Sequence, residues 1–372
     1  MQRMLGLASV SASMLLLAQP FRAMADEDEP DNGSFLYVMT NAAAGNTVLV
    51  FRRNADGTLT KAQEVPTQGL GSGGTGDPLG SQGALTLNGD GRLLLAVDAG
   101  SNEISALAVT DSGLQFVSKA WSGGTKPVSV AVDGDVAYVL NAGGTPNVTA
   151  FRIGLHGELQ MIANSARVLP GGANSAPAQV GVSRNDEVLV VTEKNTNKID
   201  LFPLDDSGHM ANGSSVASDG GVPFGFAFGA DGTLVVSEAA ASTFSSYSIH
   251  SVENNPTLQT ITKSLPDMGA AACWIVTSHS GELAFASNSA NHTISSLSVS
   301  SDGMLHVLSA VAANTGAGTV PTDLTLTGGG GFLYVISTSN GELKGYRVQN
   351  GALSQVASVT GLPVSIQGIA AR

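Results

Sequence analysis

The stretch Pro127-Val-Ser-Val-Ala-Val132 turns at Asp133-Gly134 into a second apolar run, Val136-Ala-Tyr-Val-Leu-Asn141. Two short apolar runs on either side of an Asp-Gly pair are typical of a β-hairpin. Two weaker strands follow, one at residues 148–153 and one after the turn at His156-Gly157. The stretch therefore predicts a unit of four short antiparallel strands.

The same pattern recurs along the chain, for example at residues 224–238 and 322–337. The first strands of successive units start near Ser81, Pro127, Pro177, Pro223, Ala272, Pro321 and Ile366. The spacings between these starts are 46, 50, 46, 49, 49 and 45 residues. All-β units of that length are the signature of β-propeller blades, and apolar runs of helical period are absent after the N-terminal segment.

The two ends of the repeat region predict how the ring closes. Residues 35–40 have the pattern of a second strand with no first strand before it, and residues 365–371 that of a first strand with nothing after it. If the C-terminal strand completes the N-terminal blade, no sheet edge stays open. We therefore expect an all-β fold, a seven-bladed β-propeller of four-stranded antiparallel blades, over residues 34–372.

Composition excludes several classes of protein. Glycine makes up 46 of 372 residues and charged residues only 13 %, which argues against disorder and against a coiled coil. The net charge is −13, with 17 Lys and Arg against 30 Asp and Glu, so we expect no nucleic-acid partner. Cys273 is the single cysteine, which excludes an intrachain disulfide and a zinc site of several cysteines.

The first 25 residues have the pattern of a secretory signal peptide. Arg3 precedes an apolar run, and Ala23-Met24-Ala25 offers a small-x-small cleavage site. An acidic segment follows at residues 26–33. The alternative is a membrane anchor, but the apolar run is too short to span the bilayer comfortably. We expect an exported protein, periplasmic or extracellular after cleavage near Ala25, with no membrane span and as a monomer.

The repeat unit resembles a known family. Its Leu-Tyr-Val strand, as in Phe35-Leu-Tyr-Val38 and Phe332-Leu-Tyr-Val335, followed by a hairpin with Gly-x-Leu, is similar to the seven-bladed lactonase family. That family includes bacterial 6-phosphogluconolactonase and fungal carboxymuconate-lactonizing enzymes, and the surface-layer YVTN repeats have a similar unit. The resemblance covers residues 34–372. It implies the propeller fold, lactone hydrolysis and a small-molecule lactone as partner.

Polar residues end every second strand of the predicted blades. They are Thr40, Asp98, Asn141, Glu193, Glu238, Asn288 and Ser337. These ends lie on the same face of the ring as the starts of the first strands. Turn preference explains Asn, Ser and Thr at such positions, but it explains Glu193 and Glu238 poorly. We expect one of these glutamates to be the general base, with Lys194 or a backbone N–H stabilising the oxyanion; structural hydrogen bonding is the alternative.

Further polar and aromatic residues lie near the predicted channel mouth. The expected substrate-binding residues are Gln179, Asn141, Asp98, Trp274, Asp323, Gln82 and His292. Two of them have a plain structural alternative: Asp323 as a tie between blades, and Trp274 as a channel filler. Where the phosphogluconolactonase branch carries a histidine motif, Ala176-Pro-Ala-Gln-Val180 has none. Few cations face the predicted mouth, so we expect a non-phosphorylated lactone.

Two alternatives to a metal-free hydrolase remain open. We expect no cofactor, but a divalent cation could be held in the channel by oxygen ligands from Glu193, Glu238, Asp98 and Asn141. The other alternative is a non-catalytic binding or interaction propeller of the cell envelope, because the sequence offers no nucleophile paired with a base.

Overall fold

The structure is a computed structural model, and it describes residues 34–185, 187–252 and 255–372. These residues belong to one compact unit, Asp31–Arg372. The predicted signal peptide, its cleavage site and the acidic segment 26–33 lie outside the described residues. Within the described ranges, no helix is long and apolar enough to cross a membrane.

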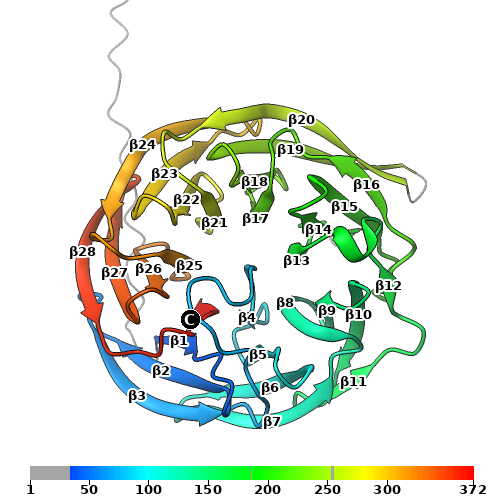
Figure 1. Ribbon diagram of the computed structural model, residues 1–372, viewed down its shortest axis with the longest axis horizontal. Coiled ribbons are helices and arrows are strands. Elements are labelled where there is room, and N and C mark those ends of the chain that lie inside the picture. Colours follow the sequence, from blue (N-terminus) through cyan, green and yellow to red (C-terminus); the bar gives the residue numbers. More distant parts are fainter. Residues whose placement is uncertain (1–33, 186, 253–254) are drawn as a thin grey trace, which may run out of the picture. The chain divides into compact units, whose positions relative to one another are not determined.

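The described strands form seven antiparallel sheets arranged in a ring (Figure 1), which confirms the predicted seven-bladed propeller. The first three blades are β29 (Ile369–Ala371), β1 (Phe35–Met39), β2 (Thr47–Arg53) and β3 (Leu59–Pro66); β4 (Leu85–Leu87), β5 (Leu93–Asp98), β6 (Glu103–Thr110) and β7 (Gly113–Trp121); and β8 (Thr125–Asp133), β9 (Val136–Gly143), β10 (Asn147–Ile153) and β11 (Leu159–Met161), with β12 (Arg167–Val168) also paired to β10.

The remaining four blades follow the same order of strands from the axis outward. They are β13 (Pro177–Val182), β14 (Val188–Glu193), β15 (Lys198–Pro203) and β16 (Ser214–Ala217); β17 (Pro223–Phe228), β18 (Leu234–Glu238), β19 (Thr243–Val252) and β20 (Asn255–Pro266); β21 (Ala272–Thr277), β22 (Leu283–Asn288), β23 (Thr293–Val299) and β24 (Leu305–Asn314); and β25 (Pro321–Leu326), β26 (Phe332–Ser337), β27 (Glu342–Gln349) and β28 (Ala352–Val359). A short 3₁₀ turn, Gly172–Asn174, precedes the fourth blade.

The C-terminal strand closes the ring as predicted. β29 pairs antiparallel with β1, and Leu36 lies opposite Ala371 while Val38 lies opposite Ile369. The N-terminal blade therefore takes its innermost strand from the other end of the chain. Without β29, β1 would form the inner edge of this blade; with it, the blade has the same four strands as its neighbours.

The innermost strands start close to the predicted residues. β13, β17, β21 and β25 begin at the predicted residue, whereas β8 begins two residues earlier, at Thr125. β4 begins later than predicted because the residues before it pack along the axis, as described below. β29 also begins later, because Gly368 has a φ of 89° and leaves the extended conformation.

Burial follows the position of a strand within its blade. The second strands β14 and β26 are buried along their whole length, since neighbouring blades cover both of their faces. The outer strand β3 is mostly exposed. Fully buried strands read as continuous apolar runs, which is why the second strands were the clearest signal in the sequence.

Candidate functional site

Strand direction gives the ring two different faces. The face that carries the second-strand ends and the connections between blades is called the channel face here. The opposite face carries the turns between first and second strands. The predicted site residues all lie at the channel face or on the inner strands beside it: Gln82, Asp98, Asn141, Gln179, Glu193, Lys194, Glu238, Trp274, His292 and Asp323.

Glu238 ends β18 and is fully buried, with 0 % relative exposure. Its carboxylate accepts hydrogen bonds from the backbone N–H of Gly220 at 2.7 Å and from the hydroxyls of Thr243 and Ser245, both at 2.6 Å. Ser218 adds a longer bond of 3.2 Å. A carboxylate enclosed by four donors serves as a fixed acceptor, so Glu238 fastens the connection between the fourth and fifth blades.

Glu193 ends β14 and is equally buried. Its carboxylate accepts a hydrogen bond from the backbone N–H of Gly171 at 3.0 Å and another from the hydroxyl of Thr196. Asp200 lies nearby, and burial together with the neighbouring Glu193 carboxyl raises the pKa of Asp200 to about 8. Asp200 therefore holds a proton more firmly than a surface aspartate does.

Other second-strand ends repeat this arrangement. Asp98 is buried and accepts hydrogen bonds from the hydroxyls of Thr67 and Ser105, both at 2.6 Å, and burial raises its pKa. In five blades a glycine of the incoming connection packs against the polar side chain, at a place where a Cβ would come within 2.0–2.7 Å of it. The pairs are Gly69 with Asp98, Gly124 with Asn141, Gly171 with Glu193, Gly220 with Glu238, and Gly269 with Asn288.

The possible metal ligands are not brought together. Glu193, Glu238, Asp98 and Asn141 lie in four different blades, and each is bound into its own blade connection. In the part of the chain that the structure describes, no three His, Cys, Asp or Glu side chains lie close enough to hold a metal ion. The residues present do not fit a channel cation.

Two glutamines fasten inner strands: Gln179 on β13 joins β17 of the neighbouring blade, whereas Gln82 in the β3–β4 connection reaches β21, in a blade that is not its neighbour. The side-chain amide of Gln179 accepts from the backbone N–H of Phe226 at 2.7 Å and donates to its carbonyl at 3.0 Å. Gln82 makes the same pair of bonds with Ile275, at 3.0 and 2.7 Å. An amide that satisfies both backbone groups of one residue has little capacity left for a ligand.

Asp323 and His292 also connect blades. Asp323 accepts a hydrogen bond from the backbone N–H of Gly368 at 2.9 Å, and burial raises its pKa to about 8. His292 donates from Nδ1 to the carbonyl of Thr319 and has a φ of 64°. Residues at the same turn position of other blades share this left-handed conformation: Asn102, Asn197 and Ser242. His292 therefore occupies a repeated structural position.

The connection from β3 to β4, residues 67–84, closes the axis of the ring. Figure 1 shows it running into the middle of the ring. Its Ser81 hydroxyl donates to the carbonyl of Val128 at 2.8 Å. From the other side, Trp274 is only 2 % exposed and donates from Nε1 to the carbonyl of Ser81 at 2.8 Å. Trp274 thus fills the channel, and residues 79–83 are called the plug below.

Asp77 lies just before the plug on the same connection. The backbone N–H of Gly80 donates to its Oδ1 at 2.9 Å, and the side-chain amide of Gln367 donates to the same oxygen. Its Oδ2 has no hydrogen-bond partner among the described residues, and the side chain is exposed to solvent. Surrounding protein still raises the pKa of Asp77 through burial, although the hydrogen bond from Gln367 and the nearby charge of Lys194 oppose the shift.

Lys194 follows β14 directly and lies on the other side of Gly80 from Asp77; the space between its Nζ and Asp77 Oδ2 is called the recess below. Its Nζ donates to the carbonyl of Gly80 and, at 3.5 Å, to that of Pro177. The ammonium also lies 5.0 Å from the centre of the Phe224 ring. Burial lowers the pKa of Lys194 to about 8, an effect that the charge of Asp77 opposes. This lysine is therefore cationic at neutral pH but loses its proton more readily than a surface lysine.

Asp77 and Lys194 face each other across a short gap. A Cβ at Gly80 would lie 3.1 Å from Lys194 Nζ and 3.9 Å from Asp77 Oδ2, so the separation of these two atoms is at most the sum of those distances. The described residues show no direct ion pair between them. The arrangement therefore puts a proton acceptor and a cationic donor on the two sides of one space, and lactone hydrolysis requires groups of these two kinds.

Cys273 supplies no nucleophile to this recess. It lies buried on β21, and burial raises the pKa of its thiol to about 12. A thiol with so high a pKa stays protonated at neutral pH, whereas a catalytic cysteine needs its thiolate.

Sequence reasoning found Lys194 but missed Asp77. Asp77 stands in a glycine-rich connection, Gln68-Gly-Leu-Gly-Ser-Gly-Gly-Thr-Gly-Asp77, which has no strand pattern. Two signals were available: this is the longest connection between blades, and Asp77 is its single charged residue. A long loop on a rigid scaffold is a common place for functional residues.

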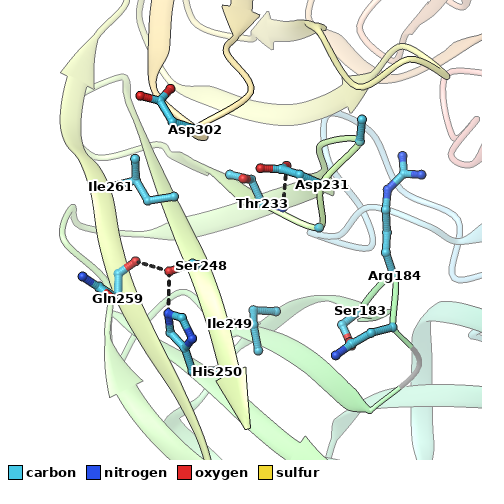
Figure 2. A pocket seen from close by; sticks show the side chains of 13 residues that line it. Ser183, Arg184, Asp231, Thr233, Ser248, Ile249, His250, Gln259, Ile261 and Asp302 are labelled. Atoms are coloured by element: carbon cyan, nitrogen blue, oxygen red, sulfur yellow. Dashed lines mark hydrogen bonds between the residues drawn. The ribbon is translucent and has the colours of Figure 1, made fainter.

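A cavity of about 600 Å³ lies on the opposite face and includes none of the predicted site residues (Figure 2). Its ionisable lining residues are Arg184, Asp231, His250 and Asp302. Asp231 accepts a bond from the backbone N–H of Thr233 at 3.1 Å, and Asp302 likewise accepts within its own turn. These carboxylates are occupied in holding turns, so we place the candidate site at Asp77 and Lys194 instead.

The sequence matches the family described as lactonase, 7-bladed beta-propeller, over residues 27–173 and 133–264. The chain belongs to the lactonase family of seven-bladed β-propellers. The resemblance inferred from the repeat unit is therefore confirmed. No curated protein matches the chain.

Solved structures share the fold of this lactonase-family chain at low sequence identity. The periplasmic gluconolactonase of Pseudomonas aeruginosa has a TM-score of 0.70 at 17 % identity, with 91 % of this chain and 98 % of that chain covered. A candidate 6-phosphogluconolactonase from Bacteroides fragilis has a TM-score of 0.68 at 16 % identity, with 92 % and 99 % covered. At these identities the likeness establishes the fold alone.

Proposed function

We propose that this lactonase-family propeller hydrolyses a small lactone in the recess between Asp77 and Lys194. The observation that carries the proposal is the free Oδ2 of Asp77. One oxygen of this carboxylate is fixed by two donors, while the other is open to solvent beside an ammonium group. A base must be held in place and must also reach water, and Glu193 and Glu238 meet only the first condition.

The reaction uses the two side chains in turn. Asp77 Oδ2 takes a proton from a water molecule, and the water oxygen attacks the lactone carbonyl carbon. The carbonyl oxygen becomes an oxyanion, which the Lys194 ammonium stabilises. The ring oxygen then leaves as the C–O bond breaks, and Asp77 returns the proton to it, which yields an open-chain hydroxy acid.

The donor count at Lys194 favours a non-phosphorylated lactone. An ammonium has three N–H donors, and two of them already point to the carbonyls of Gly80 and Pro177. One donor remains, which is enough for an oxyanion but not for a phosphate as well. Export of the chain is supported by the signal-peptide pattern of residues 1–25 and agrees with a periplasmic structural neighbour.

The test compares Asp77→Asn with Asp206→Asn, an exposed aspartate on the opposite face. We expect Asp77→Asn to lower kcat for a neutral aldonolactone by about 10²–10⁴-fold at an unchanged Tm, and Asp206→Asn to change neither. The kcat/KM of the unmodified protein rises with pH as Asp77 loses its proton and falls near pH 8 as Lys194 does.

Other outcomes would redirect the proposal. Full activity in Asp77→Asn together with its loss in Glu193→Gln or Glu238→Gln, at unchanged Tm, would move the base to that glutamate. Activity abolished by a chelator would favour a bound cation. No turnover of neutral, phosphorylated or aromatic-derived lactones would refute the hydrolase and leave a binding propeller.

A further inference from the structure

Lys194 combines three features that the hydrolytic reaction does not need together. It stands at the recess where the proposed function puts the lactone carbonyl, it lies against an aromatic ring, and a free carboxylate oxygen faces its amine across a short gap. We infer that Lys194 is also a site of covalent modification, at which the lactone acylates the Nζ amine to form a stable amide. This inference rests on the proposed function, because that function brings the lactone to the recess.

The geometry favours attack by the amine. In the proposed hydrolysis Lys194 Nζ lies next to the carbonyl oxygen of the lactone, because it stabilises the oxyanion. The carbonyl carbon, which the amine would attack, is only one bond away from that oxygen. Gly80 and Pro177 hold the Nζ through their carbonyls, and the backbone N–H of Lys194 donates to the carbonyl of Ala176 at 3.3 Å. The amine therefore stays in place while successive lactone molecules bind and leave, which raises its effective concentration toward each of them.

The protonation state of Lys194 supports the same step. With a pKa of about 8, roughly a tenth of this amine is uncharged at pH 7, against less than about a thousandth of a surface lysine. Only the uncharged amine is a nucleophile. A lactone that reaches the recess therefore meets far more reactive amine there than on the protein surface.

The step is balanced without any further reactant. The Nζ lone pair forms a bond to the carbonyl carbon, and the acyl bond to the ring oxygen breaks. The proton lost by nitrogen passes to Asp77 and then to the ring oxygen, which becomes a hydroxyl. The whole lactone is added to Lys194, so the protein gains the mass of one lactone molecule. The amide has no charge and cannot stabilise the oxyanion as an ammonium does, so modified molecules lose hydrolytic activity.

Lys344 provides a matched internal control. Its side chain is also half-buried, with 15 % relative exposure, and its Nζ donates to a backbone carbonyl, that of Thr315. It pairs with Glu342 at 3.5 Å instead of facing a free carboxylate across a recess. We therefore expect no preferential acylation of Lys344.

The experiment incubates the unmodified protein with glucono-1,5-lactone at pH 6 and pH 8 and maps the adducts by peptide mass spectrometry. We expect an adduct of one lactone mass at Lys194, at least about tenfold above that at Lys344 and faster at pH 8 than at pH 6. Hydrolytic activity falls in proportion to the adduct. Lys194→Arg, which keeps the charge, shows no adduct at this position.

The two proposals fail in different measurements. Adducts on Lys194 no more frequent than on Lys344, in a sample that still turns over lactone, would overturn the modification and leave the hydrolase intact. Absence of turnover from the first measurement, before any adduct has formed, would refute the hydrolase, and a selective adduct at Lys194 in that sample would still support the modification.

Discussion

Replacement of Glu238 tests whether the polar second-strand ends are structural or catalytic. Glu238→Ala removes the acceptor of the Gly220 N–H and of the Ser218, Thr243 and Ser245 hydroxyls at once. The hydroxyls can rotate toward other acceptors, but the backbone N–H is fixed by the connection in which it lies. Leaving the buried Gly220 N–H without an acceptor lowers the free energy of unfolding by about 1–3 kcal/mol on its own.

The whole substitution should lower the free energy of unfolding by about 3–5 kcal/mol, since an enclosed charge and its network are lost together. Glu238→Gln keeps one oxygen and the shape, so we expect a loss of only about 1–2 kcal/mol. At about 2.1 cal/mol/K of unfolding entropy per residue, a chain of this length loses roughly 4–7 °C of Tm in the first variant and 1–3 °C in the second.

The assay is thermal unfolding together with lactone turnover normalised to folded protein well below Tm. Both Glu238 variants should unfold earlier and retain kcat within about threefold. Glu282→Gln, at an exposed position, is the matched control and should change neither quantity. A Glu238→Gln protein with unchanged Tm and a kcat lowered by about 10² or more would refute the structural interpretation and make Glu238 the base.

Three further predictions concern the blade connections, the axis and pH. Gly171→Ala puts a Cβ 2.0 Å from a carboxylate oxygen of Glu193 and should cost about 1–3 kcal/mol by urea unfolding, whereas Gly329→Ala, with nothing within 4 Å, should cost less than about 0.5 kcal/mol; equal costs would contradict the packing argument. Asp323 has a folded pKa of about 8, above its unfolded value of about 3.9, so the native state binds more protons and loses stability as pH rises from about 4 to 8. Asp323→Asn should therefore gain stability relative to the unmodified protein between pH 5.5 and pH 8, measured by urea midpoints, and a difference that does not change with pH would refute this. Trp274→Phe leaves a void and an unpaired carbonyl on the axis, so Tm should fall while kcat is retained; a lost kcat at constant Tm would make Trp274 a substrate contact.

The fold could be predicted because its strongest signals are local and repeated. Second strands such as β14 and β26 are buried on both faces, so each reads as an unbroken apolar run that ends in a polar residue. Seven such runs at a nearly constant spacing define the blades, and the two incomplete end units define the closure. The predicted first residue of an inner strand was wrong only where the backbone is irregular, as at Gly368 before β29.

The candidate site could be predicted only in part. The positions of Glu193 and Glu238 at second-strand ends follow from the pattern, but their environments depend on glycine-containing connections whose paths the pattern does not describe. Asp77 and Lys194 are 117 positions apart in the sequence, and the plug that brings them together has no periodicity. The sequence around each of these residues does not indicate the contact, because an irregular loop that crosses the axis has no repeating pattern.

The plug has a kinetic consequence for a hydrolase. Because Ser81 and Trp274 block the axis beneath the recess, substrate cannot enter on one side of the ring and leave as product on the other. The hydroxy acid departs through the opening by which the next lactone arrives, and one molecule excludes the other. Inhibition by product should therefore be purely competitive, raising the apparent KM without lowering the maximal velocity.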